Sequence, residues 1–382
     1  MPEVSDEIEY VPAQFMRVKH VRSQKRCNVC AKIITAPAPV RVGEGLVFGP
    51  RFHAHAVVTK CADSIPFYRL AKRFQRDGMP IQRSTLNRLF HRSAEILSPI
   101  SRRIMEKVVN SEHVNADETP LMVQAPEKCH RGYMWVFMSN RLIGYEFSPG
   151  RGGETPERLL KCTKGSLQVD YYSGYNPVCA PESRERVGCM AHVRREFFRA
   201  LSYAPHDAQE ALEQILKLYD VEYEAAVKGV LYQAEHQTLR RLQSKPLLES
   251  MIKWVSAKKG CYPPQSPMGS ALGYASKVLP SLNAAMEDAR IRLDNNIAEN
   301  ALRTVALGRK NYLFVGDNES GRNLATLQTI VSTCIANDVN PEAYMADVLL
   351  RLDSTPSSKI DELLPMNWKP AAQNTTALTG DK

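Results

Sequence analysis

Apolar residues recur at helical spacing through residues 50–110. They predict one helix over about 66–76 and a second that begins near Ser84, a good N-cap residue. Residues 77–80 separate the two helices as a tight turn. A short helix, a turn and a basic helix would suit a helix-turn-helix DNA reader, and an ordinary amphipathic helix is the alternative. The polar face of the second helix carries Arg83, Asn87, Arg88, His91 and Arg92.

The pattern then changes to strand-like runs between residues 112 and 170. Aromatic and β-branched residues, which sheets favour, gather at about 113–117, 121–124, 133–138, 141–147 and 166–170. Met190–Leu201 is predicted to be a basic helix, and residues 206–285 are almost wholly helical. Helical periodicity returns at 294–352, with a loop around Gly316–Gly321. We interpret the middle helical block as an insertion into an α/β domain.

The length of 382 residues predicts two or three domains. The extended A-P-A-P-V stretch at 36–40 marks a boundary between the N-terminal arm and the helical region after it. We divide the chain into a basic N-terminal segment with half of a zinc-binding module (1–45), a helical DNA-binding region (46–110), the first part of the α/β core (111–205), the helical insertion (206–288), the final core helices (289–340), and a C-terminal element and tail (341–382).

The charge balance favours a polyanionic partner without identifying one. Lys and Arg total 50 and Asp and Glu total 41, so the formal net charge is +9, although many proteins are mildly basic without binding nucleic acid. No apolar run follows Met1, and no apolar stretch approaches the roughly 18 residues of a membrane span. With nine scattered cysteines, the expected compartment is the reducing cytoplasm, with no membrane partner.

Three acidic residues stand out by their positions. Asp117, in V-N-A-D-E-T-P, and Asp170, in L-Q-V-D, come at predicted strand ends. Glu299, in L-D-N-N-I-A-E-N-A-L-R, lies on a helix. Two aspartates on strands and one glutamate on a helix would suit two Mg²⁺ ions, which prefer hard oxygen ligands. The alternatives are turn residues for the aspartates and an exposed pair between Glu299 and Arg303.

Local geometry refines these expectations. Adjacent strand residues point to opposite faces, so only one of Asp117 and Glu118 can serve the site, and we expect it to be Asp117. Pro120 is expected to end the regular pairing of this strand. On the helix, Asp294 is the expected N-cap, and Asn295 shares a face with the glutamate.

Two pairs of residues have the spacing of half a zinc site. Cys27 and Cys30 form a C-x-x-C pair, but a structural zinc ion needs four ligands and no second such pair follows. We therefore expect no tight zinc binding there in a single chain. Cys189 and His192 form a C-x-x-H pair, for which a packed thiol and a hydrogen-bonded histidine are the commoner explanation.

These sequence words together resemble the insertion-sequence-66 family of bacterial transposases over about residues 8–368. The words that carry the resemblance are E-Y-V-P-A-Q-F at 9–15, K-H-V-R-S-Q-K-R-C-N-V-C at 19–30, A-P-A-P-V at 36–40, A-D-E-T-P at 116–120, G-Y-M-W-V-F at 132–137, L-Q-V-D-Y-Y-S-G-Y at 167–175, C-M-A-H-V-R-R-E-F-F at 189–198, L-D-N-N-I-A-E-N-A-L-R at 293–303, L-G-R-K-N-Y-L-F-V-G at 307–316 and D-E-L-L-P-M-N-W at 361–368.

The resemblance implies an RNase H-like core with an Asp-Asp-Glu site. Asp117, Asp170 and Glu299 would bind two Mg²⁺ or Mn²⁺ ions for DNA cleavage and strand transfer at the ends of a mobile element. The implied partners are double-stranded DNA of the element ends and the target, further copies of this chain on the DNA, and accessory proteins of the same element in the nucleoid. Candidate phosphate contacts near the acids are Arg194, Arg195, Arg303, Arg309 and Lys310.

Three departures from the family pattern keep a second hypothesis open. Relatives usually have a coiled coil and a first C-x-x-C before the point where this chain begins, so an N-terminal truncation is expected. Tyr171 stands where relatives have glycine or alanine, and Asn300 stands where they have arginine. The second hypothesis is a truncated or decayed, non-catalytic relative that occupies element ends. A third, an RNase H-type nuclease acting on hybrids or junctions, does not explain the flanking words.

Overall fold

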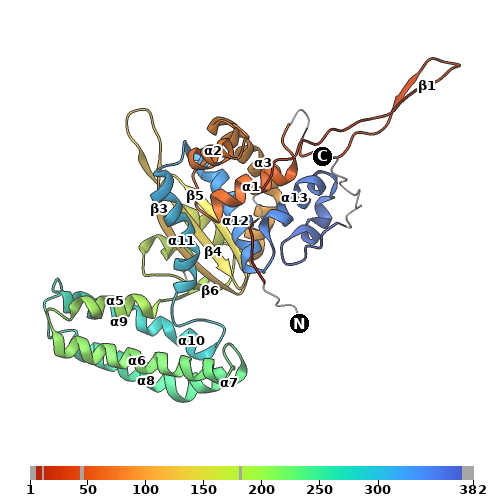
Figure 1. The fold of residues 1–382 in the computed structure, drawn as a ribbon. Helices are drawn as coiled ribbons and strands as arrows, with labels where there is room; N and C mark the ends of the chain where they lie inside the picture. The colour runs from red at the N-terminus through yellow and green to blue at the C-terminus, as the bar shows by residue number, and fades with distance from the viewer. Residues whose placement is uncertain (1–5, 11–12, 44–46, 180–182, 372–382) are drawn as a thin grey trace, which may run out of the picture.

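The computed structural model describes residues 6–10, 13–43, 47–179 and 183–371. The parts of the predicted N-terminal segment at 1–5, 11–12 and 44–46, and of the predicted tail at 372–382, lie outside these residues. A short hairpin of β1 (Gln24–Arg26) and β2 (Ile33–Thr35) projects away from the body of the molecule (Figure 1).

A mixed five-stranded sheet forms the centre of the molecule. Its strand order is β5-β4-β3-β6-β7, with β3 in the middle. The β3–β4 and β4–β5 pairs are antiparallel, and the β3–β6 and β6–β7 pairs are parallel. The strands are β3 (His113–Val123), β4 (His130–Ser139), β5 (Leu142–Ser148), β6 (Gly165–Gln168) and β7 (Arg184–Val187). The α/β class predicted from the sequence is therefore confirmed.

Two details of the predicted sheet are wrong. Strand β3 continues through Pro120, which pairs with Tyr133 of β4. Strand β6 pairs with β3 only as far as Asn115, so Pro120 lies where one edge of β3 has no neighbouring strand, and proline is tolerated at such an edge. Strand β7, with the charged sequence R-E-R-V, was not predicted at all.

Helices cover the sheet on both faces and along one edge. Helix α3 (Arg83–Val109) packs against β4 and β5, and α11 (Asn296–Tyr312) packs on β3. Helix α12 (Asn318–Ala336) covers the free edge of β5, where the backbone N–H of Tyr145 donates to the Thr329 hydroxyl at 2.8 Å. A covered edge cannot pair with another chain, so this contact protects the sheet from aggregation.

The N-terminal helices share the hydrophobic core of the sheet. Helices α1 (Pro50–Cys61), α2 (Phe67–Arg76) and α3 contribute buried residues to the same cluster as the strands. Gly78, with φ of +83°, forms the predicted turn before α3. Helix α3 begins at Arg83 and is flanked by Gln82, so the prediction of Ser84 as N-cap was wrong. Helix α13 (Pro341–Arg351) packs on α1.

A second hydrophobic core belongs to the predicted helical insertion. It extends from Val187 to Leu293 and so includes α5, which precedes the expected start of the insertion. The insertion lies beside the sheet-containing body as a separate layer of helices (Figure 1). Its helices are α5 (Met190–Ala200), α6 (Pro205–Val227), α7 (Ala234–Leu239), α8 (Lys245–Lys258), α9 (Pro267–Val278) and α10 (Asn283–Glu287). None of the helices in the described ranges has the length and apolar character to cross a bilayer.

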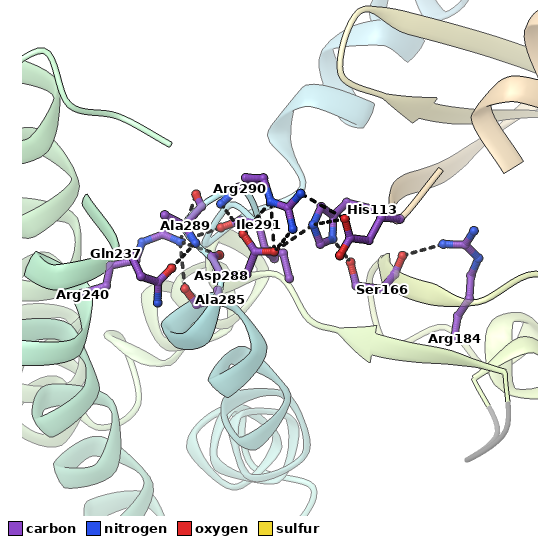
Figure 2. A network of polar contacts seen from close by, with 11 residues as sticks. His113, Ser166, Arg184, Gln237, Arg240, Ala285, Asp288, Ala289, Arg290 and Ile291 are labelled. Atoms are coloured by element: carbon purple, nitrogen blue, oxygen red, sulfur yellow. Dashed lines mark hydrogen bonds and ion pairs between the residues drawn. The ribbon is translucent and has the colours of Figure 1, made fainter. Parts of the chain in front are cut away.

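A polar cluster joins the insertion to the sheet, and we call it the junction cluster: Glu112, His113, Asp288 and Arg290. His113 Nε2 lies 2.9 Å from Asp288 Oδ2, and Arg290 bridges Asp288 at 2.6 Å and Glu112 at 3.0 Å. Figure 2 shows this network continuing to Arg240, whose buried guanidinium donates to the carbonyl oxygens of Ala285 and Ile291 at 2.9 and 2.7 Å. The insertion is therefore tied to the start of β3 by charged groups.

Candidate active site

Asp117 lies in the middle of β3, on the face that α11 covers. Its carboxylate accepts a hydrogen bond from the backbone N–H of Glu118 at 2.9 Å. Burial, together with the negative charges of Glu118, Asp170 and Glu299, raises the pKa of Asp117 to about 7. In the described part of the chain Asp117 has no ion-pair partner. A carboxylate in this setting would be stabilised by a bound cation.

Glu118 points to the opposite face of β3, as strand alternation predicts. Its side chain is 1% exposed and pairs with the Arg151 guanidinium at 2.6 Å. The Tyr175 hydroxyl donates to its second oxygen at 2.8 Å. Burial raises the pKa of Glu118, while the hydrogen bonds from Tyr175 and Arg151 oppose that rise. Glu118 therefore already pairs with the Arg151 guanidinium and the Tyr175 hydroxyl, whereas Asp117 has no side-chain partner of this kind among the described residues.

Asp170 follows β6 by two residues and makes a turn. Its Oδ1 accepts from the backbone N–H of Tyr172 at 3.0 Å, which is the local turn bond that the sequence allowed as an alternative. The same side chain raises the pKa values of Asp117 and Glu118 by its negative charge. Asp170 therefore acts as a turn residue and also lies close enough to Asp117 for its charge to act on that carboxylate.

An amide clamp fixes the start of α11 against the sheet. Asn295, 1% exposed, donates to the carbonyl oxygen of Ala116 at 2.8 Å and accepts from the Asn115 amide at 2.9 Å. That amide also donates to Gln168 at the end of β6 at 2.9 Å. The clamp therefore brings the first turn of α11, with Glu299, to the strand segments that precede Asp117 and Asp170. The sequence did not single out Gln168, because its partners lie far away along the chain.

The start of α11 differs from the prediction by one residue. Asn295 is the N-cap, and Asp294 lies just outside and accepts from the backbone N–H of Asn296 at 3.1 Å. Helix α12 likewise begins at Asn318, so the predicted loop around Gly316–Gly321 ends earlier than expected.

Glu299 turns toward α5 of the insertion. It lies 3.5 Å from Arg195 and 3.7 Å from His192, and among the described residues it makes no ion pair with Arg303. The expected alternative of a local Glu299–Arg303 pair is therefore wrong. Cys189, one turn before His192, accepts from the backbone N–H of Asn295 at 3.2 Å, so the C-x-x-H pair contacts the same helix start.

The donor atoms suit two different kinds of metal. Asp117, Asp170 and Glu299 offer only hard oxygen atoms, as Mg²⁺ and Mn²⁺ require. The ligand atoms of these three acids do not all lie within 4.8 Å of one another. In the described part of the chain, those of Cys189, His192 and Glu299 do. A pair of ions about 3.5–4 Å apart spans more space than a single ion, so the acids need not all touch one centre.

The predicted phosphate contacts fall into two groups. Arg309 donates to the Thr119 hydroxyl at 2.9 Å and to the Pro120 carbonyl at 2.6 Å, which ties α11 to β3. The side chains of the other group are exposed on α5, α11 or α3, although Arg195 pairs with Glu299 and Arg92 with Glu95 at 2.6 Å. This group contains Arg194, Arg195, Arg303 and Lys310, and on α3 Arg83, Asn87, Arg88 and Arg92.

Cys27 and Cys30 lie at the end of the projecting hairpin. Hydrogen bonds from the backbone of Cys30 and Val29 lower the pKa of the Cys27 thiol. Within the described ranges no third histidine, cysteine or acidic side chain joins the pair at ligand distance. The pair offers half of the ligands of a tetrahedral zinc site.

Comparison with known proteins places the chain in a family. A family model described as "Transposase IS66 family" matches residues 45–323, and one described as "IS66 C-terminal element" matches residues 329–366. An uncharacterized protein of Sinorhizobium fredii (strain NBRC 101917 / NGR234), y4hP, is 31% identical over 98% of this chain and 72% of its own length. Another from the same organism, y4qI, is 30% identical over 96% of this chain and 71% of its length.

Proposed function

The chain belongs to the IS66 family of transposases, and on this premise we propose that it cuts and joins DNA at the ends of a mobile element. Asp117, Asp170 and Glu299 are the proposed catalytic residues, and the sheet with α11 is the proposed RNase H-like core. Family membership supports a transposase function, and the site residues and the metal chemistry are our proposal.

One observation carries the assignment to these residues. Asp117 is a partly buried carboxylate with a raised pKa of about 7, and two of the charges that raise it belong to Asp170 and Glu299. Acids gathered around a partly buried carboxylate that has no neutralising side chain among the described residues cost free energy. Such an arrangement is expected where cations bind and is difficult to explain as a structural feature.

The chain's own residues would divide the work between metal binding and positioning. Asp117, Asp170 and Glu299 would hold two Mg²⁺ or Mn²⁺ ions, which when bound activate the attacking oxygen and stabilise the leaving oxygen. The amide clamp of Asn115 and Asn295 keeps Glu299 in register with the strand that bears Asp117. No covalent intermediate with the enzyme is required, because water and then the freed 3′-hydroxyl are the nucleophiles.

Exposed basic side chains of α5, α11 and α3 would contact DNA. Arg194, Arg303 and Lys310, which are exposed on α5 and α11, would bind the scissile strand's phosphates. The exposed face of α3 would contact DNA elsewhere. We propose double-stranded DNA of the element ends and target as the substrate, with copies of this chain assembled on it in the nucleoid. Accessory proteins of the element are a further proposed partner.

The non-catalytic alternative receives limited support from the two unusual residues. The ring of Tyr171 packs edge-on against Tyr274 of the insertion, with the Arg186 guanidinium 5.0 Å from its centre. Its bulk is therefore accommodated by the insertion. Asn300 is exposed on α11 and has no partner that would define a role among the described residues.

A strand-transfer assay on pre-cut element ends tests the proposal. In Mg²⁺ the chain should join the 3′-hydroxyl ends to target DNA, and chelation of the metal should stop the reaction. Sequence-specific binding of element ends without any joining, in Mg²⁺ or Mn²⁺, would contradict catalysis and favour the non-catalytic alternative.

A further inference from the structure

The C-x-x-H pair and Glu299 form a compact group beside the proposed catalytic acids. Ligand atoms of Cys189, His192 and Glu299 all lie within 4.8 Å of one another. Cys189 is fully buried, while His192 and Glu299 are 24% and 30% exposed, which leaves an opening to solvent. The three residues come from the start of α5 and the first turn of α11, so the group bridges the insertion and the body.

Two atoms of this group are buried and unsatisfied. His192 Nδ1 and Glu299 Oε1 face each other at 3.7 Å, and neither has a hydrogen-bond partner in the described part of the chain. The distance is too long for a hydrogen bond, yet a cation between the two atoms would satisfy both. The Cys189 sulfur belongs to the same set, because the ligand atoms of the three residues lie within 4.8 Å of one another.

The donor set determines which cation would fit. Sulfur, imidazole nitrogen and one carboxylate oxygen are the ligands of Zn²⁺, whereas Mg²⁺ and Ca²⁺ require oxygen alone. A thiolate and a carboxylate would balance the charge of a divalent ion, and the thiol proton would leave to solvent as the metal binds. The backbone N–H of Asn295 already donates to the sulfur at 3.2 Å, a contact that stabilises a ligating thiolate.

We propose that Cys189, His192 and Glu299 bind a thiophilic divalent cation such as Zn²⁺, with water as the fourth ligand, and that this ion withdraws Glu299 from the Mg²⁺ site. One carboxylate cannot serve both sites in the same geometry, so zinc would inhibit DNA cleavage. The inhibitory part of this proposal rests on the proposed function, whereas the binding part does not.

Cobalt spectroscopy tests the binding part directly. The metal-stripped full chain carrying Cys27→Ser and Cys30→Ser is titrated with Co²⁺, which reports thiolate ligation by a near-ultraviolet charge-transfer band. One Co²⁺ per chain should bind with this band, and Zn²⁺ should displace it. Cys189→Ser should remove the band, and Cys261→Ser, at an exposed cysteine of the insertion, should keep it.

A second variant protects the test against misfolding. His192→Gln keeps a side chain of similar polarity and should weaken Co²⁺ binding by at least roughly the 10–100-fold that loss of an outer partner costs. Circular dichroism checks the fold of both variants. Absence of the band in the parent, or its survival in folded Cys189→Ser, would overturn the proposed site, and unchanged affinity in His192→Gln would overturn the role of His192.

Strand transfer in Mg²⁺ tests the inhibitory part. Added Zn²⁺ should inhibit the parent, and Cys189→Ser, whose hydroxyl can still accept from Asn295, should keep its activity and resist Zn²⁺. Equal inhibition of both would mean that zinc acts at the Mg²⁺ site and would refute the proposal. If neither the parent nor Cys189→Ser transfers strands, the proposed function fails. The cobalt result still decides whether the metal site exists.

Discussion

Two groups of acidic residues lie beside β3, and they differ in how their charge is balanced. In the junction cluster, Arg290 pairs with both Glu112 and Asp288, and hydrogen bonds from Arg290 lower the pKa of Asp288 to about 2. In the candidate site, Asp117 has no cation beside it in the described chain, and burial raises its pKa to about 7. Charge balance therefore distinguishes a structural tie from a candidate ligand site better than the number of acids does.

The two groups also lie at different positions along the parallel strands. The junction cluster lies at the start of β3, while Asp117 lies just beyond the part of β3 that pairs with β6, and Asp170 lies two residues beyond the end of β6. Ligand sites of α/β sheets form at carboxyl ends, where strands stop and loops begin. Substitutions in the candidate site should therefore change the rate of strand transfer. Substitutions in the junction cluster, or in the network that continues from it to Arg240, should change the free energy of unfolding.

The largest effect is expected from Asp117→Asn. The amide has the size of the carboxylate but is neutral and a poor metal ligand, so strand transfer should fall by at least the roughly 10²–10³-fold that loss of one preorganised electrostatic contact costs. DNA affinity should remain, because a metal ligand acts mainly on the transition state. Single-turnover strand transfer and a filter-binding assay measure the two quantities.

Glu118→Gln is the matched control for this substitution. Its side chain points to the other face of β3 and pairs with Arg151, so turnover should change far less than in Asp117→Asn. A dead Glu118→Gln beside an active Asp117→Asn would reverse the roles of the two acids. Equal, small losses of strand transfer in both variants would contradict the comparison, because neither Asp117 nor Glu118 would then be catalytic.

The next largest effect is expected from Arg240→Met, in the polar network that continues from the junction cluster into the insertion. Arg240 is fully buried and pairs with Glu222 at 2.7 Å, so its loss would leave a partly buried charge and several carbonyl groups unsatisfied. The free energy of unfolding should fall by about 3–5 kcal/mol. Urea denaturation measures the change. Arg241→Met, in an exposed pair with Glu287, should cost less than about 1 kcal/mol.

Asp288→Asn should have a smaller effect that depends on pH. The pKa of Asp288 is lowered from 3.8 to about 2, so its stabilising contribution is complete above the unfolded pKa and is lost as pH falls through the folded pKa. At pH 7 the substitution should lower the free energy of unfolding by about 1–2 kcal/mol. Denaturation at several pH values should show this loss shrinking between about pH 4 and 2. A constant loss would contradict the ionic tie.

The smallest effect is expected from Arg88→Gln on α3, outside both acidic groups. If its exposed side chain contacts a phosphate, the slope of log affinity against log salt should fall by about 1, with turnover on bound DNA unchanged. Affinity measured over a range of salt concentrations tests this. Arg241→Gln, on the insertion, provides a charge-matched control, and an equal change in both would show a general effect of net charge.

Local patterns predicted the helices well. The helical spacing of apolar residues predicted the helix that is α3, and the structure buries Leu86, Leu89 and Phe90 of that spacing. Residues three and four apart face one side of a helix wherever the chain packs, so such patterns need no knowledge of distant segments. The turn at Gly78 was likewise predicted from local residues alone, because residues 77–80 break the helical pattern.

Contacts between distant segments could not be predicted in the same way. Pro120 was expected to end its strand, but β3 continues because the neighbouring strand stops short of it. Glu299 was given Arg303 as its local alternative partner, but α5 brings Arg195 and His192 closer. The sequence selected the three acids, whereas the clamp that orients Glu299 depends on Gln168, whose role only the folded sheet reveals.

Anomalous diffraction from crystals soaked in Mn²⁺ tests the central claim most directly. Mn²⁺ replaces Mg²⁺ at oxygen ligands and can be located by its own signal. We expect two peaks about 3.5–4 Å apart among Asp117, Asp170 and Glu299, and none at the junction cluster, where Arg290 already neutralises the acids. Peaks at Glu112 and Asp288 with none beside Asp117 would contradict the account.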